Sequence, residues 1–290
     1  MNEHPMLGRL SLLNSHRPIY PTTFGGDDFD DWSLWDWCQQ CHRKNGLAVW
    51  VHAFRSESGL LGGEALAACI LGQIDALEFD CTPRTQPLLP WVYKLWNAGF
   101  RVPLVGGSGK QSNRIPLGAM RTYAKLNEGD PRTYPSWVQA VREGRTFISN
   151  GPILNWDSTA SQVIAESIVP FERLEIVANG RAIATTNAVL SDGIWRADVE
   201  RGAQWPEAGW WAARCIGGAE SPLYPEMPAF AHTSPMRIGT EGFDDPTAKI
   251  ALRPCIEKTM EWIRAEGRFA EEKFRTQMLE RCAKALAAIH

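Results

Sequence analysis

Apolar runs of strand length alternate with helix-like segments through the first half of the chain, and this alternation restricts the fold more than any other feature. Helix signals separate the runs: acidic residues open the segment 30–45, and Gly46 ends it. We expect strands at 9–13, 47–52, 75–80, 102–106, 119–125 and 146–149, and helices at 30–45, 63–71, 90–97 and 136–143. Strands and helices at this spacing indicate βαβ units, so the sequence predicts an α/β fold with a mostly parallel sheet or barrel.

The pattern changes near residue 151. Two short apolar runs, 174–178 and 181–184, flank Asn179-Gly180, a dipeptide preferred in tight hairpin turns. Further strands are expected at 195–199, 209–216 and 230–238, and helices from Pro246 onward. We therefore expect three domains: a β/α barrel portion at 1–150, a small antiparallel β domain at 151–240, and C-terminal helices at 241–290.

A lone histidine ends the strand Leu47-Ala-Val-Trp-Val-His52. In a parallel β/α barrel, ligands and metals gather at the C-terminal ends of the strands. An imidazole there can hold a metal or carry a proton, although a core histidine bonded to one carbonyl is an equally good interpretation. Glu78 and Asp80 end the next strand, and we expect one of them to face the same rim. Capping of the following loop is the alternative role for either carboxylate.

Gly106-Gly-Ser-Gly-Lys110 is similar to a phosphate-binding loop, but the motif fails at two positions. Leu104 stands where it needs glycine, and Gln111 where it needs serine or threonine. Two interpretations remain: a bend that holds an anion, with Ser108 and Lys110 as polar tips, and a plain turn. A metal-free hydrolase with Ser108 as its nucleophile is a weaker hypothesis.

Other motifs have simpler explanations. Cys38-Gln-Gln-Cys41-His42 matches a haem attachment string, but it lies in a predicted helix and no export signal precedes it. The acidic run 27–31 lacks the spacing of a calcium-binding EF-hand and fits helix capping. His232 lies in the β part of the chain, where we expect a structural role.

Composition argues against several classes of partner. The net charge of −3 gives no electrostatic case for a nucleic-acid partner. The longest apolar stretches, such as 65–71, are too short to span a bilayer, so no membrane partner is expected. No basic segment followed by an apolar one opens the chain, and the seven cysteines are widely spread. Both features favour a cytoplasmic protein with free thiols.

Seven strings resemble, in order, those of the CehA/McbA branch of the PHP-type metal-dependent hydrolases. They are Ala48-Val-Trp-Val-His52-Ala-Phe, Gly62-Gly-Glu-Ala-Leu66, Ala76-Leu-Glu-Phe-Asp80, Asn97-Ala-Gly-Phe-Arg-Val-Pro-Leu104, Gly118-Ala-Met-Arg-Thr-Tyr123, Gly144-Arg-Thr-Phe-Ile-Ser-Asn-Gly-Pro152 and Ala231-His-Thr-Ser-Pro235. The resemblance covers nearly the whole chain. It implies an incomplete or distorted β/α (PHP-like) barrel, followed by a β appendage.

The resemblance also implies a divalent metal, zinc or manganese, with His52 and Glu3 as ligands. His52 and Asp80 would be the catalytic residues. Substrate contacts would come from Ser108, Lys110, Arg121 and Asn150. A bound divalent metal would lower the pKa of its water and polarise an ester, amide or phosphoester bond.

The chain departs from the family pattern at its metal ligands. The opening Asp-x-His-x-His segment has no counterpart here, and Ala53 replaces the proline that follows the histidine. Arg9 stands where the family has the histidine of a Gly-His string, and Gly109 stands where many relatives have aspartate. Two functions are therefore expected: a metal-dependent hydrolase with a reduced or truncated site, or a catalytically inactive descendant. The second would bind a small molecule or a protein, with the metal lost. The oligomeric state stays open.

Overall fold

The computed structural model describes residues 2–4, 6–21, 29–55, 59–80, 88–110, 113, 115–156, 162–202, 205–221, 224–239 and 243–290. The chain divides into two compact units. The first unit comprises residues 1–78, 98–102 and 244–290, and the second comprises residues 79–97 and 103–243. Both units are discontinuous in sequence, because the segment 98–102 and the C-terminal helices belong to the first.

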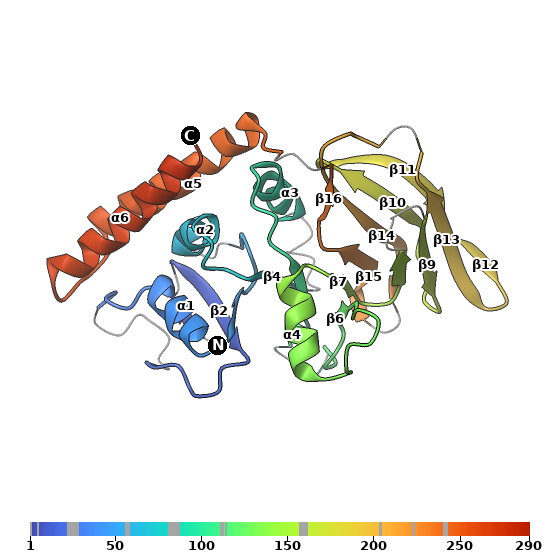
Figure 1. Cartoon of the computed structure of the whole chain (residues 1–290), viewed down its shortest axis with the longest axis horizontal. Coiled ribbons are helices and arrows are strands. Elements are labelled where there is room, and N and C mark those ends of the chain that lie inside the picture. Colours follow the sequence, from blue (N-terminus) through green and yellow to red (C-terminus); the bar gives the residue numbers. More distant parts are fainter. Residues whose placement is uncertain are drawn as a thin grey trace. The chain divides into compact units, whose positions relative to one another are not determined.

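The first unit is a small sheet with helices packed against it (Figure 1). Its strands are β1 (Asn2–His4), β2 (Gly8–Leu13), β3 (Leu47–Trp50) and the start of β4 (Ala76–Asp80). β1 pairs antiparallel with β2, β2 pairs antiparallel with β3, and β3 pairs parallel with β4. Its helices are α1 (Leu34–Arg43), α2 (Gly63–Ile70), α5 (Pro246–Ala265) and α6 (Glu272–Ala288). α5 and α6 lie side by side, and α2 packs against both.

Local sequence explains where these helices begin. Ser33 and Asp36 form a capping box at the start of α1, in which each side chain accepts a hydrogen bond from the other residue's backbone N–H. Asp245 caps α5, whose first residue is Pro246. Gly63 opens α2 with a φ of +53°, and a Cβ there would lie 2.5 Å from the Leu7 carbonyl oxygen. This position therefore requires glycine.

Two antiparallel sheets form most of the second unit. The larger has the order β11-β10-β14-β15-β7-β6, with β16 paired to β14, and the smaller has the order β12-β13-β9-β8. The bounds are β6 (Arg121–Ala124), β7 (Thr146–Ser149), β8 (Ile153–Trp156), β9 (Gln162–Ser167), β10 (Arg173–Ala178), β11 (Arg181–Asn187), β12 (Val189–Ser191), β13 (Ile194–Glu200), β14 (Gly209–Ser221), β15 (Tyr224–Thr233) and β16 (Met236–Ile238). The unit also holds α3 (Leu89–Asn97), β5 (Leu104–Gly107) and α4 (Tyr134–Arg142). β5 is next to β4 in the order of the first sheet.

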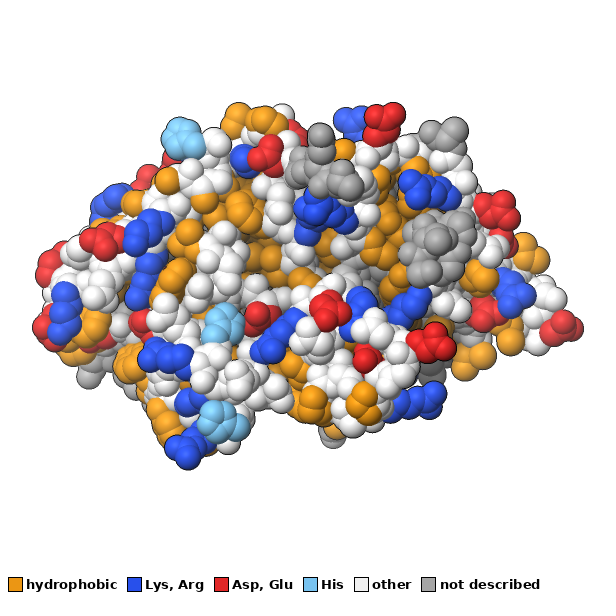
Figure 2. Space-filling view, in the orientation of Figure 1, with side chains coloured by type: hydrophobic (Ala, Val, Ile, Leu, Met, Phe, Trp, Pro, Cys, Tyr) orange, Lys and Arg blue, Asp and Glu red, His pale blue; other side chains and the backbone are white. Residues whose placement is uncertain are grey.

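The surface is chemically mixed. Figure 2 shows Lys and Arg side chains interspersed with Asp and Glu on the face in view, with apolar side chains between them. None of the described helices combines the length and the apolar character that crossing a membrane requires.

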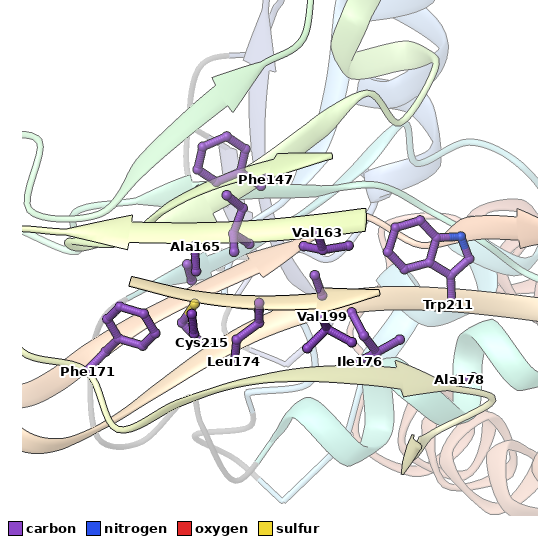
Figure 3. Packing of buried hydrophobic residues seen from close by; sticks show 14 of the residues in the cluster. Phe147, Val163, Ala165, Phe171, Leu174, Ile176, Ala178, Val199, Trp211 and Cys215 are labelled. Atoms are coloured by element: carbon purple, nitrogen blue, oxygen red, sulfur yellow. The ribbon is translucent and has the colours of Figure 1, made fainter. Parts of the chain in front are cut away.

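The core of the second unit lies between its two antiparallel sheets (Figure 3). Val163 and Ala165 point inward from β9, and Leu174 and Ile176 point inward from β10. These positions are two residues apart, as expected for strands that bury one face. Burial of an aliphatic side chain of this size contributes about 1.5–3 kcal/mol, so the alternating pattern holds the two sheets together.

The prediction of a β/α barrel is wrong. The described residues form 16 strands in three sheets, none of which closes into a barrel, and the fold is mixed α/β with a β-rich part. Strand direction is the reason. β2 and β3 pair antiparallel although α1 lies between them in sequence, whereas a β/α barrel needs parallel neighbours. The hairpin at Asn179-Gly180 is confirmed, because Ala178 pairs with Arg181. The domain boundaries at 150 and 240 stay a prediction.

Candidate functional site

His52 lies in a tight turn directly after β3. Its backbone adopts a φ of +51°, and Phe54 follows with a φ of +65°. The Arg55 N–H donates to the His52 carbonyl at 2.8 Å, and the Phe54 ring packs 4.9 Å from the Trp50 ring. A non-glycine residue in the left-handed region costs on the order of 1 kcal/mol and persists where its surroundings hold it, often at functional sites. The turn thus fixes the imidazole, which is 9% exposed.

Glu78 is the carboxylate that the structure brings to His52. Its Oε1 lies 3.9 Å from the His52 Nδ1, and its backbone carbonyl accepts from the Ala53 N–H at 3.4 Å. The sequence prediction chose Asp80, whose side chain lies outside the described residues. Glu78 and Asp80 are two residues apart on one strand, so alternation alone did not select between them.

Glu3 and Arg9 form an ion pair across β1 and β2. The two residues are register partners, and the Arg9 Nε lies 2.5 Å from the Glu3 Oε1. The Arg9 carbonyl accepts from the Val51 N–H at 3.0 Å, next to His52 in sequence. Side chains of neighbouring strands at one level of a sheet point to the same face. Trp50 pairs with Leu77, so Val51 and Glu78 come next at one level of β3 and β4. Arg9 lies opposite Val51, so the Arg9 and Glu78 side chains point to the same face of the sheet.

We call Glu3, Arg9, His52 and Glu78 the sheet-end cluster. All four belong to the first unit, and each side chain is largely but not completely buried. The cluster offers two carboxylates, one guanidinium and one imidazole, which together can donate and accept hydrogen bonds. Partly exposed polar groups at one end of a sheet suit the binding of a small polar molecule.

The described residues do not fit a metal centre. Among them, no three His, Cys, Asp or Glu side chains come together in a way that would hold an ion. Of the two predicted metal ligands, Glu3 has its carboxylate paired with a guanidinium instead. A metal ion on the Glu3 carboxylate would lie beside the Arg9 guanidinium, whose positive charge repels it.

The four predicted substrate contacts lie in the second unit, and each has a partner there. Ser108 Oγ accepts from the Gly118 N–H, and Lys110 Nζ donates to the Ile115 carbonyl. Arg121 is exposed, with its guanidinium 5.9 Å from the centre of the Tyr123 ring.

Asn150 is fully buried. Its Nδ2 donates to the Pro228 carbonyl, and its Oδ1 accepts from the Phe230 N–H. These bonds make Asn150 part of the β15 pairing, and a substrate role for any of the four residues stays a prediction.

His232 belongs to a buried polar chain that the sequence did not reveal. Its Nε2 lies 2.6 Å from the Tyr93 hydroxyl, and its Nδ1 lies 2.7 Å from the Thr233 carbonyl oxygen. Nδ1 must carry the proton, because the carbonyl only accepts, so the Tyr93 hydroxyl donates to Nε2. The Arg214 Nη1 donates to that hydroxyl, and its Nε donates to Glu175.

Burial keeps the His232 imidazole neutral. Burial and the neighbouring Arg214 charge lower the pKa of His232 to about 3, although its bond to Thr233 opposes the shift. Burial raises the pKa of Tyr93 to about 12. The ring is completely enclosed. This enclosure agrees with the expected structural role of His232. Its hydrogen-bond partner Tyr93 is 139 residues away in sequence, so no local sequence pattern indicates the contact.

Comparisons with family models, curated proteins and solved structures found no match for this chain. The sheet-end cluster is therefore the basis of the functional argument.

Proposed function

We propose that this chain is a binding module for a small polar molecule, without a resident metal, and that the sheet-end cluster contacts the ligand. The Glu3–Arg9 ion pair carries the proposal, since it commits one predicted metal ligand to a guanidinium at 2.5 Å. Charge-assisted pairs of this kind are strong and geometrically specific. The cluster then recognises a ligand by hydrogen bonds and charge instead of coordination.

His52 and Glu78 complete the recognition surface. The imidazole offers a donor or an acceptor according to its tautomer, and the carboxylate offers acceptors. The left-handed turn at residues 52–54 holds the ring beside the carboxylate before any ligand arrives. A site whose groups are already in place loses less conformational entropy when it binds.

Metal analysis and ligand-induced stabilisation test the proposal together. We expect elemental analysis of the purified protein to find less than one equivalent of zinc or manganese. A full equivalent that is lost in His52→Ala would contradict the proposal and favour the metal-dependent hydrolase.

The second arm is a thermal-shift screen with amino acids, dicarboxylates and sugars. A ligand present at a hundredfold excess over its Kd stabilises the folded state by about 2.7 kcal/mol. We expect the shift to disappear in Arg9→Met and to persist in the matched control Arg17→Met, which removes an exposed arginine. If Arg9→Met leaves the thermal shift of a ligand unchanged, that ligand binds elsewhere, and the sheet-end cluster is not its binding site.

A further inference from the structure

The smaller antiparallel sheet of the second unit has an exposed outer face with apolar side chains. Alternate residues of β8, β9 and β13 pack into the core, and the others point away from it. Four apolar side chains on the outward side are 41–78% exposed: Ile153, Ile168, Val189 and Ile194. Clustered apolar side chains on a surface indicate an interaction site, whereas single ones need no explanation.

The strand register arranges this face in rows. Val189 pairs with Arg196, Arg196 with Glu166, and Glu166 with Ile153. One row across the four strands therefore reads apolar, positive, negative, apolar. The Arg196 Nε donates to the Glu166 Oε1 at 2.9 Å, and both side chains are exposed.

This row is complementary to itself under a twofold rotation. Consider a twofold axis in the plane of the face, parallel to the strands and midway between β13 and β9. The rotation brings Arg196 of one copy over Glu166 of the other, and Val189 over Ile153. Each charge then faces an opposite charge, and each apolar side chain faces an apolar one, as an isologous interface requires.

One neighbouring row follows the same rule. Trp195 pairs with Ser167, the last residue of β9, and the residues that come next are Ile194 at the start of β13 and Ile168 just after β9. The same axis places Ile194 of one copy over Ile168 of the other. These two rows match under one symmetry operation, whereas the row of Asp198, Ile164 and Asn155 would place a carboxylate over an apolar side chain.

We propose that this outer face (Ile153, Glu166, Ile168, Val189, Ile194 and Arg196) binds a second copy of the chain in a twofold-symmetric dimer. Figure 2 shows apolar side chains beside side chains of both charges over the end of the second unit where β12 and β13 lie in Figure 1. Four strands about 4.8 Å apart and three to seven residues long give a face on the order of 300 Å² per copy. Standard interfaces bury about 800 Å² per partner, so the dimer is expected to be weak.

Sedimentation equilibrium of the full chain, from low-micromolar to near-millimolar concentration, tests the proposal. We expect the average mass to rise with concentration toward that of a dimer. Arg196→Glu sets like charges against Glu166 of the same and the other copy, and should weaken the dimer roughly tenfold or more. The double variant R196E/E166R keeps the row self-complementary and should restore association. Ile250→Asp, at a position 65% exposed on α5, is the control and should change nothing.

Two results would overturn the proposal: a mass that stays monomeric throughout the range, or a dimer that R196E leaves intact. Circular dichroism establishes whether R196E is folded. If it is not, Ile168→Asp takes its place, because Ile168 is 78% exposed just after β9 and tolerates a polar side chain. That variant must weaken the dimer equally, and an unchanged dimer would again refute the interface.

Discussion

Mild acidification should destabilise the fold through one buried imidazole, His232. The folded ring donates from Nδ1 to the Thr233 carbonyl and accepts at Nε2 from Tyr93, so it has no site for a second proton. The pKa of His232 in the folded protein is about 3, against about 6.5 for a histidine in an unfolded chain. Below pH 6.5 the unfolded chain binds a proton that the folded chain refuses, so stability is lost as the pH falls from about 6.5 toward about 3.

The magnitude follows from these two pKa values. Between about pH 7.5 and about pH 5, protonation of the unfolded histidine lowers the free energy of unfolding by about 2 kcal/mol. Carboxylates with ordinary pKa values change little in this range. Burial raises the pKa of Glu64, but Glu64 is common to wild type and variant, so the difference between them isolates His232. Urea unfolding at each pH, followed by tryptophan fluorescence, measures the effect.

His232→Gln should remove this pH dependence, although its overall stability will be lower. The difference between wild type and variant should shrink by about 2 kcal/mol from about pH 7.5 to about pH 5. His16→Gln, which replaces an exposed histidine, should behave like wild type. A wild type and an H232Q variant with parallel pH profiles would refute the neutral, enclosed imidazole.

Two further predictions concern packing. Gly63→Ala should destabilise the chain by at least about 2 kcal/mol, because its Cβ would meet the Leu7 carbonyl. Gly129→Ala should cost less, since its Cβ meets nothing within 4 Å and only the positive φ is strained; equal thermal shifts in the two variants would contradict this. Six described cysteines are buried and free, and burial raises the pKa of Cys282 to about 12. They should react with Ellman's reagent far more slowly in the native than in the unfolded protein, and several fast native thiols would contradict the burial.

Local patterns determined the elements, and non-local pairing determined their assembly. The Asn179-Gly180 turn was predictable because its chemistry lies in two adjacent residues. The antiparallel pairing of β2 with β3 was not, since a buried strand has the same apolar pattern in either direction. The helix 134–142 begins two residues before the expected start at 136, because the Thr133 hydroxyl accepts from the Ser136 N–H and caps the helix there.

The candidate site also combines features that local sequence predicts with features that depend on non-local pairing. His52 was recognisable from its position at a strand end, but its contact with Glu78 depends on register between strands. The Glu3–Arg9 ion pair depends on a hairpin that brings β1 against β2. Tyr93 and His232 come together only in the folded unit, so neither residue carries a local sign of the other.

Calorimetric titration of the purified chain with zinc and with manganese tests the central claim most directly. The account predicts no saturable binding that depends on His52, because Arg9 already occupies the Glu3 carboxylate. Saturable binding near one equivalent that disappears in His52→Ala, and strengthens in Arg9→His, would contradict it.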